Sequence, residues 1–121
     1  MEHKIGYISY ISMRFNVHPV ESICVGMVMI DDKDHATIRL SDIKMKMAKK
    51  IIKGYGFKLF KHSVDAMVKS QNLITLKKLN RLHVYQNGIL MVSEPIAIDL
   101  DGIEDDYFDK MFFKRIEEKF Q

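Results

Sequence analysis

Few residues of this chain could perform covalent chemistry. The nucleophiles are several serines and one cysteine, Cys24, and the candidate general bases are His18, His35, His62 and His83. None of them stands in a local signature of a nucleophilic enzyme. Cys24 falls in an apolar segment, which favours an inert, small apolar side chain over a reactive thiol. The sequence therefore predicts no catalytic residue, and we expect the protein not to be an enzyme.

A run of carboxylates from Asp99 to Asp106 has the composition of a site for a hard cation. An EF-hand loop needs a glycine at its sixth position, whereas Gly102 is the fourth residue of this run. A turn followed by acidic residues at a helix start explains the segment better. The acidic segment from Asp31 to His35 is likewise interpreted as a polar hairpin tip. We expect no metal and no cofactor.

A possible site at the first predicted hairpin consists of Arg14, Glu21 and Gly26. Arg14 and Glu21 flank a turn that contains Pro19, so they could face each other as an ion pair, which we interpret as structural rather than functional. Glycine within an apolar strand indicates a bulge or another backbone that approaches closely. An enzyme or small-ligand binder built around these three residues is the weakest of our hypotheses.

Lysine dominates the middle of the chain. Residues 39–81 contain 12 Lys or Arg and only 2 Asp, whereas residues 94–121 carry 9 acids and 4 bases. At about 100° per residue, a helix over residues 42–53 places four lysines opposite its apolar side, and the next helix adds two more. We call these residues the basic face: Lys46, Lys49, Lys50, Lys53, Lys58 and Lys61. This face is either solvated, or neutralised by the acidic tail of its own chain, or bound to something acidic outside it.

The apolar pattern predicts the elements that must position these residues. Strands are expected over residues 5–14, 20–30, 36–40 and 89–93, and extended chain over 96–100. Pro95 follows the strand over 89–93 and confines that strand to an edge or a break in the sheet. The strand over 20–30 is apolar on both faces and should be interior. Helices are expected over 42–53, over 57–70, from Asn72 to about residue 83, and in a final segment that carries Phe108, Phe112, Phe113 and Ile116. The pair Asn87-Gly88 is either a hairpin or a helix end.

The order βββαααβα indicates an α+β fold, with an antiparallel sheet of about four strands and helices packed on one face. A chain of 121 residues with 47% apolar content forms one domain, residues 1–121. A single cysteine fits a reducing cytoplasm, and the N-terminus shows no signal peptide. The longest uncharged apolar run, residues 22–30, is too short to span a bilayer, so we expect no membrane partner.

Two segments of the sequence resemble a known family. Residues 10–15, the turn with Pro19, and residues 21–29 resemble the opening of a family of small bacterial proteins, the domain of unknown function numbered 3037. Members of that family show Tyr-x-x-x-Arg-Tyr and then Glu-x-x-Asn-Val-Gly-Val-x-Leu, and Cys24 occupies the position of the asparagine. Residues 89–95 and 107–112 resemble its strand near Ser-Pro and its closing helix. The resemblance implies an accessory or modulatory role beside toxin proteins.

Two classes of function remain. The first is a non-enzymatic interaction protein whose basic face or methionine-rich surface binds an acidic protein partner, as a regulator or inhibitor in a bacterial or phage conflict system. The second is nucleic-acid binding by the same lysines, which would neutralise phosphates. Lysine in place of arginine and the absence of a groove-reading motif count against the second class. A homo-oligomer is also expected to be possible, because the basic middle of one copy can pair with the acidic tail of another.

Overall fold

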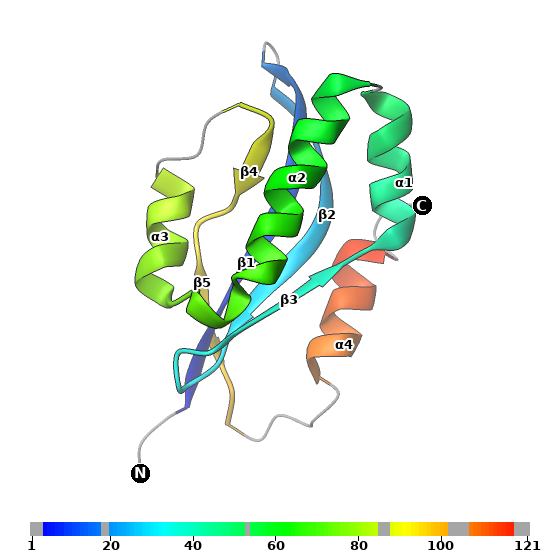
Figure 1. Ribbon diagram of the computed structural model, residues 1–121. Coiled ribbons are helices and arrows are strands. Elements are labelled where there is room, and N and C mark those ends of the chain that lie inside the picture. Colours follow the sequence, from blue (N-terminus) through cyan, green and yellow to red (C-terminus); the bar gives the residue numbers. More distant parts are fainter. Residues whose placement is uncertain (1–3, 18–19, 53, 85–87, 102–106, 118–121) are drawn as a thin grey trace.

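The molecule consists of an antiparallel sheet with helices on both of its faces (Figure 1). The computed structural model describes residues 4–17, 20–52, 54–84, 88–101 and 107–117. The order βββαααββα confirms the α+β class. In chain order the elements are β1 (Ile5–Val17), β2 (Val20–Ile30), β3 (Ala36–Leu40), α1 (Asp42–Ile51), α2 (Tyr55–Lys69), the 3-10 turn η1 (Gln71–Leu73), α3 (Leu76–Val84), β4 (Leu90–Val92), β5 (Ile96–Asp99), α4 (Tyr107–Phe112) and the π-helical turn η2 (Phe113–Glu117).

The strands are arranged in the order β3-β2-β1-β4, with β5 also paired to β1. β4 lies opposite residues 11–13 of β1 and β5 lies opposite residues 5–8, so the two follow one another along the same edge. Ser93 fills the break between them, because its backbone N–H donates to Tyr10 O at 2.9 Å and its Oγ accepts from Tyr10 N at 2.7 Å. Pro95 has no N–H for a ladder. The sheet therefore has five strands rather than about four.

A β-bulge interrupts β2 at Gly26, as the sequence predicted. Ile11 pairs with Gly26 and Ser12 pairs with Cys24, which leaves Val25 as the extra residue. A second backbone also approaches this glycine, since a Cβ there would lie 2.5 Å from Arg39 O on β3. The extra residue shifts the alternation of side chains, so apolar residues on both sides of the bulge reach the same core.

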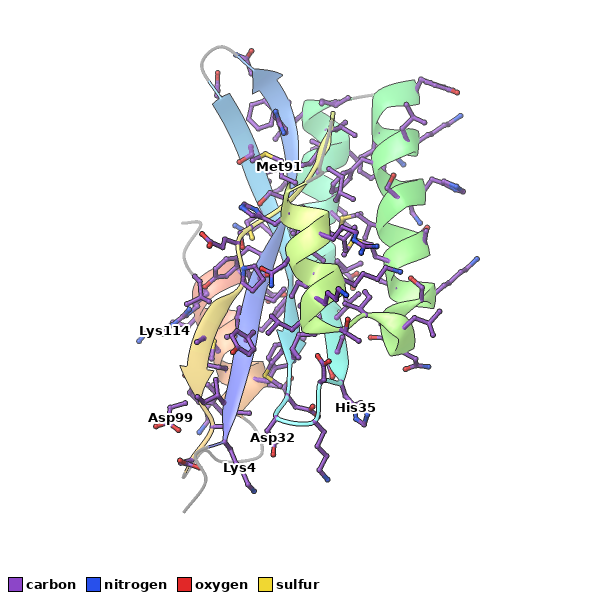
Figure 2. All side chains as sticks on the ribbon, turned by 90° about the vertical axis from the view of Figure 1, so that its left-hand side faces the viewer. Lys4, Asp32, His35, Met91, Asp99 and Lys114 are labelled. Carbon is purple, nitrogen blue, oxygen red and sulfur yellow. The ribbon has the colours of Figure 1, made fainter. Side chains whose placement is uncertain are left out.

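Two hydrophobic cores lie on the two faces of the sheet. The larger core joins the sheet to α1, α2 and α3, and its largest fully buried side chains include Ile11, Met13, Ile30, Phe60, Ile74 and Leu79. The smaller core joins the opposite face to α4 and η2 through Ile8, Met27, Met111, Phe112 and Ile116. Figure 2 shows the sheet edge-on between these two layers. The expectation that the helices pack on one face was therefore wrong, because β1 and β2 present apolar side chains on both faces and each face needs a cover.

Side-chain hydroxyls begin two of the helices. Ser41 Oγ accepts from the backbone N–H of Lys44 at 3.2 Å at the start of α1. Thr75 Oγ1 accepts from Lys78 N at 3.2 Å at the start of α3. Asn72, the expected cap of this helix, lies instead in η1. The third helix therefore begins later than the sequence indicated.

The end of α3 decides between the two interpretations of Asn87-Gly88. Residues 76–84 are helical, so this pair does not join two strands. Gly88 has a positive φ of 68°, and Asn87 lies outside the described residues. The preferred interpretation, a helix that ends near His83, is confirmed.

The outer edge of β3 is covered by η1. The backbone N–H of Ile38 donates to Gln71 Oε1 at 3.0 Å, so a side-chain amide takes the place that another strand would occupy. Leu73, which falls within the helix expected from Asn72, lies in this turn and is 71% exposed.

Candidate functional site

A groove of about 830 Å³ lies between α1 and α2, and five of the six lysines of the basic face line it. The loop that joins the two helices is short, with Gly54 at a positive φ of 76°, and the helices consequently lie side by side (Figure 1). Lys53, the sixth lysine, lies outside the described residues. The structure thus brings Lys46, Lys49, Lys50, Lys58 and Lys61 together around one concave surface.

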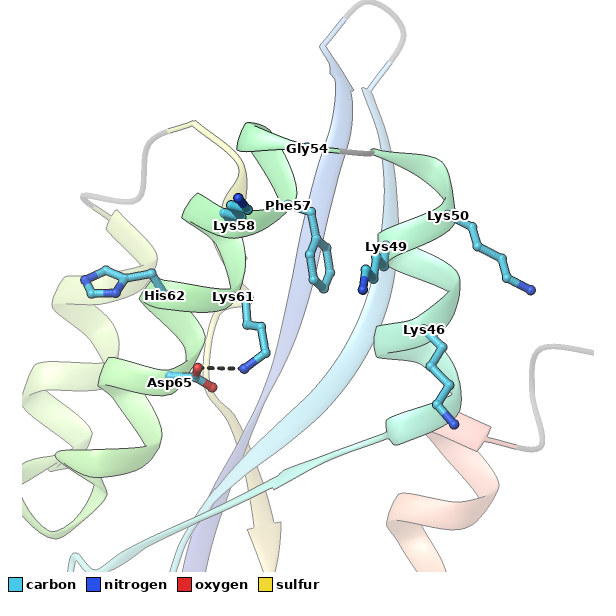
Figure 3. Close-up of a pocket in the computed structure, with 9 residues that line it drawn as sticks. All are labelled: Lys46, Lys49, Lys50, Gly54, Phe57, Lys58, Lys61, His62 and Asp65. Carbon is cyan, nitrogen blue, oxygen red and sulfur yellow. Dashed lines mark hydrogen bonds and ion pairs between the residues drawn. The ribbon is translucent and has the colours of Figure 1, made fainter.

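The floor of the groove is apolar. Phe57 is 8% exposed and packs near Phe60, with 6.4 Å between the ring centroids. Figure 3 shows Phe57, Lys49 and Lys61 between the two helices, whereas Lys50 and His62 point away on the outer flanks. The groove therefore combines an apolar floor with cationic walls.

One acid among the described lining residues faces these lysines. Asp65 accepts from Lys61 Nζ at 2.8 Å, and both side chains are about half exposed. An exposed pair at this spacing on a helix contributes about 0.3–0.5 kcal/mol. Within the described residues, Lys46, Lys49, Lys50 and Lys58 have no carboxylate partner. The described lining of the groove therefore carries more positive than negative side chains.

The described part of the acidic tail does not cover the groove. α4 and η2 pack on the opposite face of the sheet against Ile8 and Met27. Asp109 of α4 pairs with Arg39 of β3, whose guanidinium lies 4.5 Å from the centroid of the Phe112 ring. Residues 102–106, which hold three of the acids, lie outside the described residues. Internal neutralisation of the groove is therefore not found in the part of the tail that the structure describes.

The hairpin residues Arg14, Glu21 and Gly26 do not form one cluster. The register places Glu21 opposite Asn16, whose Nδ2 donates to Glu21 Oε1 at 2.9 Å. Arg14 lies opposite Ser22, and no ion pair joins it to Glu21 in the described part of the chain. Gly26 is in the bulge farther along β2. The expected ion pair across the hairpin is therefore absent from the described residues.

The described histidines occupy separate places in the fold. His83 Nδ1 lies 2.8 Å from Val92 O and attaches α3 to β4, whereas His35 and His62 are exposed. His18 lies outside the described residues. Over the described ranges, no histidine bonds a serine or a cysteine, and no group of three His, Cys, Asp or Glu residues could hold a metal ion.

A second hollow, of about 620 Å³, lies on the α4 side of the sheet, and sequence reasoning missed it. Its polar lining comes from four elements: Tyr10 and Ser12 of β1, Ser22 and Cys24 of β2, Lys44 of α1 and Arg115 of η2. Cys24 is half-buried here, with its Sγ 3.6 Å from Gly26 O, rather than enclosed in the core. Within α1, Ile43 is 59% exposed, whereas Lys44 is only 3% exposed. Lys44 precedes the buried Ala48 by four residues, and residues at this spacing lie on the same side of a helix. The burial of Lys44 could therefore have been predicted from its spacing to Ala48.

Burial lowers the pKa of the Lys44 ammonium below its ordinary value, while the charges of Cys24 and Glu117 act in the opposite direction.

Comparison of the chain with protein-family models, with curated proteins and with solved structures gave no match. None of the helices in the described residues has the length and apolar character needed to cross a bilayer.

Proposed function

We propose that the protein is a non-enzymatic interaction protein whose groove between α1 and α2 binds an acidic segment of a partner protein. The observation that carries this proposal is the combination of an apolar floor at Phe57 with lysines from both helices around it. An acidic amphipathic segment would place apolar side chains on the floor and carboxylates against the lysines. The lysine stems add apolar wall surface while their ammonium groups stay in water.

The groove suits a peptide better than a nucleic acid. Proteins that bind single strands stack bases on accessible aromatic rings. Phe57, the aromatic residue that lines the groove, is only 8% exposed, so it contributes apolar surface to the floor but too little of its ring for a base to stack on.

The family resemblance supports a further part of this proposal, the role of the interaction. We propose that the partner belongs to a bacterial or phage toxin or defence system and that binding regulates or inhibits it. The same groove could receive the acidic tail of a second copy, and this would be detected as concentration-dependent dimerisation.

Affinity capture from host lysate, with and without nuclease, tests the proposal. The wild type is compared with Lys49→Glu/Lys50→Glu and with the control Lys77→Glu/Lys78→Glu, which makes the same charge change on exposed residues of α3. We expect a protein partner that survives nuclease, is retained by the control and is lost on charge reversal in the groove. The same partners with all three proteins would reject the groove as the binding site.

Recovery of nucleic acid without a protein partner would reject protein binding and favour nucleic-acid binding by the same lysines. Binding to duplex DNA would then weaken with salt, with a slope of about −0.9 in log affinity against log salt for each phosphate neutralised.

A further inference from the structure

The hollow on the α4 side of the sheet has the lining of a small-anion site. Lys44, at 3% exposure, is buried beside it, and Arg115 lies across it with its Nη1 donating to the Tyr10 hydroxyl at 2.7 Å. Ser12 and Ser22 add two hydroxyl donors from neighbouring strands. No carboxylate lines the hollow among the described residues. Two cations and three hydroxyl groups are thus gathered around one space.

The fold explains why a lysine is buried at this place. β3 pairs only with residues 26–30 of β2, so the first half of β2 has no strand on its outer side. α1 packs there, since Ser41 N donates to Val25 O at 2.8 Å and fixes the start of the helix against β2. Lys44, one turn later, can therefore reach past the sheet edge to the opposite face, where Cys24 and Ile116 line the same hollow.

A third cation lies on the face of the sheet that holds the hollow, although it is not one of the residues that line it. Arg14 lies opposite Ser22 in the register, and the alternation of β1 places it on the same face as Tyr10 and Ser12. Its Nε is buried without a hydrogen-bond partner among the described residues. A buried donor without an acceptor is rare in proteins, because it costs free energy unless a bound group satisfies it.

We propose that this hollow binds a small phosphate monoester, with the phosphoryl group held by Lys44, Arg115 and the hydroxyls of Ser12 and Ser22. A phosphoryl group offers three terminal oxygens to this many donors, whereas a carboxylate offers two. The volume of about 620 Å³ exceeds the needs of a phosphate ion, and Ile23 and Ile116 supply apolar surface for an organic moiety. Desolvation lowers the pKa of Lys44, whereas Cys24 and Glu117 favour its charged form, as a bound phosphoryl group would. The site is separate from the groove of the proposed function, and either can fail without the other.

Titration of the 15N-labelled protein at constant ionic strength tests this proposal. The ligands are phenyl phosphate, inorganic phosphate and benzoate, the last a carboxylate on the same ring. We expect saturable amide shifts at Ser12, Ser22 and Cys24 with phenyl phosphate, weaker binding of inorganic phosphate, and binding of benzoate weaker by about tenfold or more. Equal binding of benzoate and phenyl phosphate would overturn the phosphate assignment.

Variants locate the site. Lys44→Met and Arg115→Gln should each weaken phenyl phosphate by about tenfold or more, whereas Lys49→Glu/Lys50→Glu should leave it unchanged. Arg115 is exposed, so its variant tests the site even if Lys44→Met does not fold. Shifts confined to the groove, or no saturation up to about 10 mM ligand, would overturn the proposal.

Discussion

The carboxylate of Asp34 accepts a hydrogen bond from the backbone N–H of Leu76, the first residue of α3, at 2.8 Å. An acid at the tip of the β2–β3 hairpin therefore caps a helix 42 residues later in the chain. Asp34 adopts a positive φ of 64°, which aspartate tolerates better than most residues. This single side chain fixes the hairpin and the start of α3 relative to each other.

Replacement of this cap should destabilise the protein. We expect Asp34→Ala to lower the free energy of unfolding by about 1–2 kcal/mol, because it leaves a helix N–H without its acceptor and places alanine at a positive φ. Urea denaturation measures the change, and Asp32→Ala at the same exposed tip is the matched control, with an expected effect below about 0.5 kcal/mol. Equal effects of the two substitutions would contradict this role for Asp34.

Gly26 should tolerate no side chain. In Gly26→Ala the new Cβ would lie 2.5 Å from Arg39 O and 2.8 Å from Leu40 Cδ2, so β3 must move away. We expect a loss of about 1–3 kcal/mol, as for other overpacked sites. Thr37→Ala, on an exposed position of β3, should cost less than about 0.5 kcal/mol under the same thermal denaturation. An unchanged melting temperature in Gly26→Ala would show that β3 can shift away from β2 at this point without loss of stability.

The burial of Lys44 makes stability depend on pH. Desolvation lowers the pKa of this ammonium in the folded protein below 10.5, so between the folded pKa and 10.5 the unfolded chain binds the extra proton. The free energy of unfolding of the wild type therefore rises with pH through this window, relative to that of a variant without an ionisable group at position 44. Lys44→Met should melt at a higher temperature than the wild type at neutral pH, and the difference should shrink toward pH 10.5. A difference that grows with pH would show that Glu117 and Cys24 outweigh desolvation.

Apolar packing, rather than an ion pair, should hold α4 on the sheet. Arg39 and Asp109 are 43% and 67% exposed, and exposed ion pairs contribute about 0–1 kcal/mol. Phe112 is 1% exposed, and its truncation to alanine should cost about 3–5 kcal/mol. Chemical denaturation of Asp109→Asn and Phe112→Ala compares the two, and added salt should reduce only the smaller effect. A larger loss in Asp109→Asn would reverse this ranking.

The elements that could be predicted from the sequence are those with a distinctive local pattern of apolar residues, glycine or lysine. β2 is apolar on both faces, and it lies between β1 and β3 as an interior strand should. Its bulge was readable from Gly26, because glycine has few other reasons to interrupt such a strand. The basic face was readable from helical spacing, and the groove gathers its described members.

The features that were missed depend on contacts between distant segments. Nothing in the local pattern of α4 says which face of the sheet it covers, since Phe112 would be buried on either face. Lys44 was missed because a lysine is normally assigned to solvent, and only the packing of α1 beside the unpaired half of β2 encloses it. The hollow that it lines draws on β1, β2, α1 and η2, so no short motif could have indicated it.

The cover on the outer edge of β3 has a consequence for how this protein meets other chains. The N–H of Ile38 is bound to Gln71, and Pro95 interrupts the β4–β5 edge, so neither edge offers a continuous row of free donors. Peptides that add a strand to a sheet need such a row. Strand addition at these two edges is therefore disfavoured, and concentrated solutions should resist the edge-to-edge association that leads exposed sheets to aggregate.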